Sequence, residues 1–427
     1  KFGKLEAQYD YQNNQRLEFD VRRGGRSVKP AVDLELQTHT ISANANMDKN
    51  LSRKYSFGLM GRYQNNFADP DTGVRRLIPD YDKYDFGIYT TTEWILNDNL
   101  TADAGIRYDF TRIDAQKFYR TSFWQSRGYD VEFPNLVTEE YRNQVLTNPV
   151  LNYHNFSGAL GVNYNINDNH NISANYIVSS RPPNSSELFS DGLHHSAARI
   201  ERGDLRIDSE HSQRIAGTYS YTKSKFNSKI EAYYNKINDF IYLVPGPEGI
   251  IPLIRGPFPV WDYIQTDALM FGIDITAVYQ FNSKWSVKNK TSFIKGYDTK
   301  ADLPLIDIPP FTTINSIKYS NTKWYNFNAS IRNEWVLEQN EFPDEYNFNV
   351  SIANEEDIYV DLGPPLAYSL FHFQSDILVP INKKSSLNIR FGVDNIFNKS
   401  YRNYLNRLRF YADDLGRNFK LQLQLNY

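Results

Sequence analysis

Apolar and polar side chains alternate at every second position through long runs of this chain, and this alternation restricts the folds that it can adopt. In residues 418–427, Phe, Leu and Tyr occupy the odd positions, whereas Asn, Lys and Gln occupy the even ones. Residues 100–110, 156–166 and 269–281 repeat the pattern. Successive side chains of a β-strand point to opposite faces. Each run is therefore predicted to be a strand with one apolar and one polar face.

Two classes of protein share this alternation, and composition helps to separate them. A soluble sandwich places its polar face in solvent, whereas a transmembrane barrel combines a polar lumen with aromatic girdles at the membrane surfaces. The 427 residues have a low mean hydropathy of −0.58, yet 15% of them are aromatic, which favours the barrel. No stretch approaches 18 apolar residues, so a transmembrane helix is not expected.

Connection lengths give a second argument for a barrel, because outer-membrane barrels alternate short periplasmic turns with long external loops. Short polar connections are predicted at Lys49–Arg53, Asn97–Asn99, Asn167–Asn169, Thr222–Lys225, Asn282–Lys284, Asn321–Lys323 and Asn382–Ser385. Long segments are predicted near 19–35, 64–83, 112–153, 180–208, 241–266, 298–310, 341–364 and 402–415. The Pro-rich stretches 245–259 and 302–310 are expected to be irregular parts of these loops.

The fifteen connections join sixteen predicted strands. They lie near 2–18, 36–48, 54–63, 84–96, 99–111, 154–166, 170–179, 209–221, 226–240, 267–281, 285–297, 311–320, 324–340, 365–381, 386–401 and 416–427. The predicted fold class is thus all-β, a transmembrane antiparallel barrel that occupies residues 1–427 as one domain, with no helix of useful length.

Candidate chemistry is sparse. The chain has no Cys, and it lacks the nucleophile-elbow, zinc-protease and phosphate-loop motifs, so neither an enzyme nor an intrinsic cofactor is predicted. The charge balance of 47 − 50 = −3 gives no reason to expect nucleic acid. Of the seven His residues only His194 and His195 are adjacent.

Basic and aromatic loop residues are the remaining candidates for ligand binding. The guanidinium group is a planar fork for carboxylates, so loop arginines are candidates to hold an anionic ligand: Arg22, Arg23, Arg181, Arg199, Arg202 and Arg407. Alternatively, such residues bind lipopolysaccharide phosphates or pair with loop acids. Trp124 and Trp261 are candidates to stack on a flat ligand, or else to pack the loops together.

Three stretches carry a resemblance to one known family. The first is Gly392–Tyr401, G-V-D-N-I-F-N-K-S-Y, followed by Gly416–Phe419, G-R-N-F. The second comprises Ser180–Pro183, Glu187–Phe189, Gly192, His194–His195, Glu201, Gly203, Leu205 and Glu210. The third is Tyr11–Arg23, Y-Q-N-N-Q-R-L-E-F-D-V-R-R. Together they resemble TonB-dependent outer-membrane receptors, and the third resembles ferric-siderophore and ferric-citrate members.

The resemblance implies a larger architecture than the sixteen predicted strands. Receptors of this family have a twenty-two-stranded barrel around an N-terminal plug, so the chain is expected to be the C-terminal barrel part, without the plug and first six strands. The alternative is a complete sixteen-stranded porin with an open aqueous channel. The porin predicts ion conductance by this chain alone.

The resemblance also implies a function. Such a receptor, multi-pass in the bacterial outer membrane, would bind and import an iron chelate, a ferric siderophore or ferric citrate. Energy would arrive from TonB-ExbB-ExbD through the missing plug region. Lipid, lipopolysaccharide and a surface lipoprotein are further expected partners. The alternative within the family is a haem receptor in which His194 or His195 ligates the haem iron.

Overall fold

The computed structural model describes residues 3–19, 30–50, 52–73, 75–253, 256–343, 346, 348–350, 358–360, 363–382 and 384–427. The chain divides into two compact units. Unit 1 comprises residues 1–161, 176–213 and 237–267, and unit 2 comprises residues 162–175, 214–236 and 268–427. Within the described ranges, no helix has the length and apolar character needed to cross a membrane.

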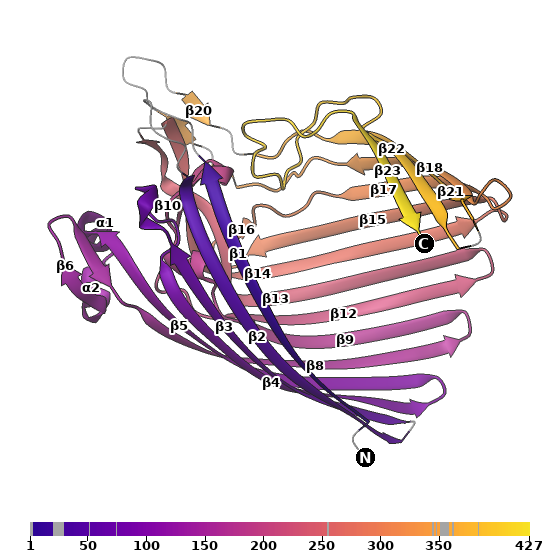
Figure 1. Cartoon of the computed structure of the whole chain (residues 1–427), viewed down its shortest axis with the longest axis horizontal. Coiled ribbons are helices and arrows are strands. Elements are labelled where there is room, and N and C mark those ends of the chain that lie inside the picture. The colour runs from indigo at the N-terminus through magenta and orange to yellow at the C-terminus, as the bar shows by residue number, and fades with distance from the viewer. Residues whose placement is uncertain are drawn as a thin grey trace. The chain divides into compact units, whose positions relative to one another are not determined.

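Long antiparallel strands in chain order dominate unit 1 (Figure 1). They are β1 (Lys4–Phe19), β2 (Pro30–Asn50), β3 (Arg53–Ala68), β4 (Asp80–Asn97) and β5 (Leu100–Arg120). The connections of unit 1 contain shorter helices and strands. These are η1 (Pro70–Thr72), α1 (Thr121–Ser126), α2 (Tyr129–Glu132), η2 (Pro134–Leu136), β6 (Val137–Glu140), β7 (Gln144–Thr147), α3 (Ser185–Phe189), β10 (Asp191–His194), η3 (His195–Ala197) and β11 (Arg199–Arg202).

Unit 2 has the same antiparallel chain order near the C-terminus. Its strands there are β15 (Trp285–Asp298), β16 (Leu303–Pro304), β17 (Thr312–Asn321), β18 (Phe327–Val336), β21 (Tyr368–Pro380), β22 (Ser386–Asp394) and β23 (Asn418–Asn426). A separate two-stranded sheet joins β19 (Phe348–Val350) to β20 (Ile358–Val360).

Five further strands contain residues of both units. They are β8 (Val150–Asn167), β9 (His170–Arg181), β12 (Glu210–Lys223), β13 (Phe226–Leu253) and β14 (Gly256–Gln280). Hydrogen bonds join 21 of the described strands in one sheet. The sixteen long ones confirm the sixteen predicted strands, and the tight turns between them fall at the seven predicted short connections.

The two faces of the sheet differ as the sequence predicts. In unit 2, Ile317 pairs with Ile331 across β17 and β18, and each side chain is 53% exposed. One position along, Ser316 pairs with Arg332, which in turn pairs with His372 on β21. Because neighbouring residues on a strand face opposite ways, Ile317 and Ile331 lie on one face and Ser316, Arg332 and His372 lie on the other.

The Pro-rich stretch 245–259 differs from its prediction as an irregular loop, since β13 and β14 extend through most of it. The added length is supported by β11, which pairs in parallel with β14 and places Ile200 beside Val260. Both side chains are buried there. The alternation rule could not anticipate this partner, because β11 has only four residues.

The predicted strand 386–401 is also too long, because β22 ends at Asp394. Asn395 and Asn398 follow with φ angles of 49° and 53°. Asn tolerates this left-handed conformation better than most residues, and a strand cannot continue through it.

Candidate ligand-binding site

An aromatic core fills the end of unit 1 at which the long connections gather. β5 contributes Ile113 and Tyr119, and the segments after it contribute Trp124 and Tyr129. The Trp124 side chain is 2% exposed, and its ring centroid lies 5.1 Å from that of Tyr129 in an edge-on arrangement. This cluster, called the loop-end core below, holds the connections together by burying aromatic surface.

The segment from Arg181 to Glu210 packs against the loop-end core, and charged pairs fix its path. The Arg181 guanidinium contacts the Glu187 carboxylate at 3.0 Å and the Glu210 carboxylate at 3.1 Å. Asn184 caps α3 by accepting hydrogen bonds from the backbone N–H groups of Ser186 and Glu187. Arg181 is thus paired with two carboxylates that belong, like Arg181 itself, to the second family-like stretch.

His194 lies at the centre of a buried ionic cluster. Arg16 of β1 donates a hydrogen bond to its Nε2 atom at 2.7 Å, so the proton is on Nδ1, which donates to Glu201 at 3.0 Å. Glu18 lies 3.6 Å from Nε2, and Arg199 donates to Glu201 at 2.8 Å. Both ring nitrogens of His194 are therefore engaged.

The two carboxylates of this cluster remain ionised despite their burial. Burial raises the pKa of Glu201, but the hydrogen bond from His194 and the charge of Arg199 outweigh it, so the pKa lies below its usual value. Burial also raises the pKa of Glu18. The charge of Arg16 and the hydrogen bond from the Ser196 backbone N–H lower it by more, so the pKa of Glu18 lies below its usual value. The cluster is a balanced set of charges.

Two more of the predicted binding residues, Arg202 and Trp261, lie beside the His194 cluster. Arg202 donates a hydrogen bond to Asp262 at 2.7 Å and also contacts Glu248. Burial lowers the pKa of Arg202, but the two carboxylates outweigh burial and raise this pKa above its ordinary value. Trp261 is 3% exposed, and the Arg199 guanidinium lies 4.9 Å from its ring centroid. The structure therefore brings His194, Arg199, Arg202 and Trp261 into one region.

His195 directly follows His194, and the other predicted residues lie elsewhere. His195 is half-buried in η3, and Arg407 is exposed in the connection between β22 and β23. Arg22 and Arg23 lie outside the described residues. The binding roles of these residues stay predictions.

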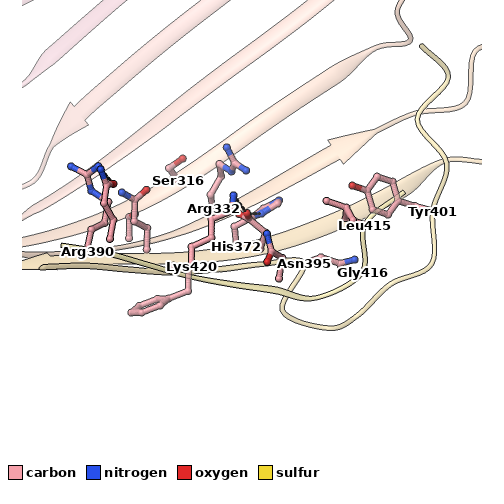
Figure 2. Close-up of a pocket in the computed structure, with 16 residues that line it drawn as sticks. Ser316, Arg332, His372, Arg390, Asn395, Tyr401, Leu415, Gly416 and Lys420 are labelled. Atoms are coloured by element: carbon pink, nitrogen blue, oxygen red, sulfur yellow. Dashed lines mark hydrogen bonds and ion pairs between the residues drawn. The ribbon is translucent and has the colours of Figure 1, made fainter. Parts of the chain in front are cut away.

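A polar pocket of about 670 Å³ lies on the polar face of unit 2. Figure 2 shows His372, Arg332 and Lys420 close together, with Arg390 at one end and Tyr401 at the other. They come from four strands of the C-terminal sheet and the segment after β22. Sequence reasoning missed this group, although each strand residue occupies a polar position of the alternation.

Pairing within this pocket is incomplete. Asp394 accepts a hydrogen bond from His372 Nδ1 at 3.0 Å and forms an ion pair with Lys420. The Nε atoms of Arg332 and Arg390 and the Nε2 atom of His372 are buried without a hydrogen-bond partner among the described residues. Unsatisfied buried nitrogens are costly, so this wall is suited to contact polar or anionic groups. The described residues contain no group of three or more potential metal-ligating carboxylates and imidazoles.

Comparison with known proteins identifies the fold. The family model "TonB dependent receptor-like, beta-barrel" matches residues 2–396. The chain belongs to the TonB-dependent receptor family. This confirms the predicted all-β barrel class, the resemblance to this family, and the location in the bacterial outer membrane.

Individual relatives are distant. The chain is 23% identical to TonB-dependent heme receptor A of Haemophilus influenzae (strain 86-028NP) over 354 residues, which are 77% of this chain and 43% of that protein. The copper transporter OprC superposes with a TM-score of 0.73 at 17% identity, over 100% of this chain and 62% of that one. The FrpB iron transporter of Neisseria meningitidis gives a TM-score of 0.64 at 14% identity, over 100% and 60%.

The chain therefore spans less than half the length of its curated relative. Its structural relatives are also longer than it is. TonB-dependent receptors work with TonB, and family members act as receptors and transporters rather than as enzymes. At these identities the structural matches establish the fold, and the transported ligand is a separate question.

Proposed function

We propose that this chain is the C-terminal barrel portion of an outer-membrane receptor that binds and imports a ferric siderophore or ferric citrate. The energy for import comes from TonB-ExbB-ExbD through the plug region of the receptor. Membership of the TonB-dependent receptor family supports active uptake. The likeness to an iron transporter is compatible with iron as the cargo.

One observation carries the choice of an anionic chelate, which is the pairing of arginines with aromatic rings at the loop end of unit 1. The guanidinium of Arg206 lies 4.8 Å from the Tyr129 ring centroid, and that of Arg127 lies 5.9 Å from it. The Arg127 guanidinium also lies 6.0 Å from the Phe123 ring centroid. The rings hold these guanidinium groups in place while Arg127 pairs with Asp204 and Arg206 pairs with Glu132, both at 2.6 Å. A carboxylate-bearing chelate that replaced these loop acids would meet oriented guanidinium forks, which suits an anionic ligand.

The test is binding of iron-loaded siderophores and of ferric citrate to the receptor in outer-membrane vesicles. We expect saturable binding that weakens at high salt, because exposed charges are screened. Arg407→Gln removes an exposed loop arginine and is expected to weaken binding roughly three- to tenfold, the effect of losing about 1 kcal/mol. Arg53→Gln is the matched control at the short-turn end, where Arg53 is also exposed.

The proposed cargo is wrong if no ferric chelate binds saturably. If binding occurs but both arginine variants resemble the parent, the cargo stands and the role of Arg407 is wrong.

A haem receptor is the second candidate, because the curated relative is named as a heme receptor. The geometry restricts how His194 could ligate haem iron. His194 Nε2 accepts a hydrogen bond from Arg16, so His194 can ligate iron only after Arg16 withdraws. Haem addition would then give a Soret band that the double substitution of His194 and His195 by Ala abolishes. Retention of the band in that variant would exclude both imidazoles as ligands.

A further inference from the structure

Three consecutive cross-strand rows of β15, β17 and β18 bring basic residues together on the polar face of unit 2. Residues that pair directly across antiparallel strands share a face of the sheet, so all members of these rows lie on one side. The rows are Ser286, Lys318 and Ser330; Lys288, Ser316 and Arg332; and Lys290, Ile314 and Glu334. This set, called the basic patch below, contains four cations and one carboxylate.

The neighbouring strands do not neutralise this charge. The residues of β14 that pair with β15 in these rows are Gln280, Val278 and Thr276. The residues of β21 that pair with β18 in these rows are Gln374, His372 and Leu370. None of the six carries a carboxylate, and Asp394 beyond them already binds His372 and Lys420. The basic patch therefore has an excess of positive charge.

The cations of the basic patch are available to a ligand. Lys288, Lys290 and Lys318 are exposed and form no hydrogen bond or ion pair with any described residue. Glu334 lies 4.0 Å from a guanidinium nitrogen of Arg332, which is beyond hydrogen-bond distance. An anion that reached the patch would not have to displace a bound carboxylate from the three lysines.

A serine lies at the centre of the cations and leaves room between them. Ser316 pairs with both Lys288 and Arg332, and Lys318 follows two residues along β17. Strand spacing and rise place the backbones of these three cations about 8–10 Å apart around Ser316. Ser316, Ser330 and Arg332 also line the polar pocket of unit 2, where Figure 2 shows Ser316 and Arg332. Their long side chains can therefore close on one ligand above Ser316.

We propose that the basic patch binds a small multivalent anion, one with several carboxylate or phosphate groups, through Lys288, Lys318 and Arg332. A single carboxylate would meet one or two of these cations, whereas several anionic groups on one molecule meet all three. The guanidinium fork fits carboxylate and phosphate oxygens, and the lysines add point charges. Serine hydroxyls supply further hydrogen-bond donors.

The position of the patch gives this site a place in the barrel. Ser286 is the second residue of β15, directly after the short connection from β14. Short turns face the periplasm in outer-membrane barrels, and the polar face lines the interior. The anion would thus bind near the periplasmic end of the interior. The site shares no residue with the arginine–aromatic contacts that carry the proposed function, and it does not depend on them.

The experiment is calorimetric titration of iron-free citrate into the detergent-purified receptor, at low ionic strength and a mildly alkaline pH at which citrate carries all three charges. We expect saturable binding by the parent that weakens as salt is added, because exposed charges are screened. Absence of saturable binding by the parent would overturn the proposal. Ferric-chelate binding is measured separately and would be unaffected, so the two proposals fail independently.

Substitution of Ser316 locates the bound anion. Ser316→Asp places a carboxylate among the cations, and Ser316→Asn is its matched control, with the same shape and no charge. We expect citrate to bind about tenfold or more weakly to Ser316→Asp than to Ser316→Asn, because like charges repel in a shared site. The Asp variant gains opposite-charge neighbours, so its Tm should not fall below that of the Asn variant. Equal citrate affinities would overturn the proposal.

Removal of one cation tests the contribution of the lysines. We expect Lys318→Gln to weaken citrate binding roughly threefold to fivefold, the range for an exposed ion pair. Lys323→Gln is the matched control, because Lys323 is exposed in the turn between β17 and β18, outside the basic patch. Both variants should keep the heat-dependent gel mobility of the parent. Equal affinities of the two variants would contradict the assignment of Lys318 and overturn the proposal.

Competition at matched ionic strength tests whether the ligand is multivalent. Displacement of citrate by tripolyphosphate but not by acetate supports a site for several anionic groups on one molecule. The relative affinities of citrate and tripolyphosphate then identify the preferred group, carboxylate or phosphate. Equally effective displacement by acetate would show a site for single carboxylates and overturn the proposal.

Discussion

Gly203 illustrates how single positions are determined by close backbone contact in the loop-end region. A Cβ atom at this position would lie 2.5 Å from the carbonyl carbon of Leu188 and 2.7 Å from the carbonyl oxygen of Glu187. The Gly203 N–H donates to the Ser190 carbonyl at 2.7 Å, and the Asp204 N–H donates to that of Glu187 at 3.0 Å. The two segments therefore cannot separate to admit a side chain without losing these bonds.

We predict that Gly203→Ala destabilises the receptor by about 1–3 kcal/mol, the usual cost of forcing extra atoms into a packed site. Thermal unfolding in detergent, followed by intrinsic fluorescence, should show a lower Tm. Gly217→Ala on β12 is the matched control, because nothing lies within 4 Å of its Cβ position. Equal Tm values for the two variants would show that the close approach at Gly203 carries no energetic cost.

Among the elements, the turn that ends β22 explains much of the C-terminal family-like stretch. The Asn395 side chain donates to the Lys399 carbonyl and accepts from its N–H, both at 2.8 Å. Asn398 Oδ1 accepts a hydrogen bond from the Arg417 N–H at 2.9 Å, just before β23 begins. These amide groups replace backbone partners that the strands no longer provide.

We predict that Asn398→Ala lowers stability by about 1–2 kcal/mol, since it removes an acceptor and places Ala at positive φ. Asn398→Gly removes the same acceptor but tolerates the φ angle, so its loss should be smaller. The midpoint of thermal unfolding of the two variants separates these terms. A larger loss for Gly than for Ala would contradict the conformational part of the argument.

Long elements were predictable from sequence, and short ones and their contacts were not. Ten or more alternating positions identify a strand such as β8 without ambiguity, whereas β10 and β11 have four residues each and show too few periods. The candidate site depends on contacts that no local pattern encodes: Arg16 and His194 are 178 positions apart. Residue type therefore indicated which arginines to consider, but not that carboxylates already pair with Arg181, Arg199 and Arg202.

At the scale of the whole molecule, the connections fall into two classes that belong on opposite sides of the membrane. The turns from β2 to β3 and from β4 to β5 span only a few residues, whereas the connection after β5 contains two helices and two short strands. In outer-membrane barrels the short turns face the periplasm. The loop-end core of unit 1 should then face the exterior, where a ligand arrives.

The chain lacks Cys, so single cysteines report this orientation without background. We predict that Val131→Cys, at an 82% exposed position in α2, reacts in intact cells with a maleimide too large for porin channels. Asp98→Cys, exposed in the turn between β4 and β5, should react only after the outer membrane is permeabilised, and the parent should not react at all. The reverse pattern would invert the barrel and place the loop-end core in the periplasm, where a surface ligand could not reach it first.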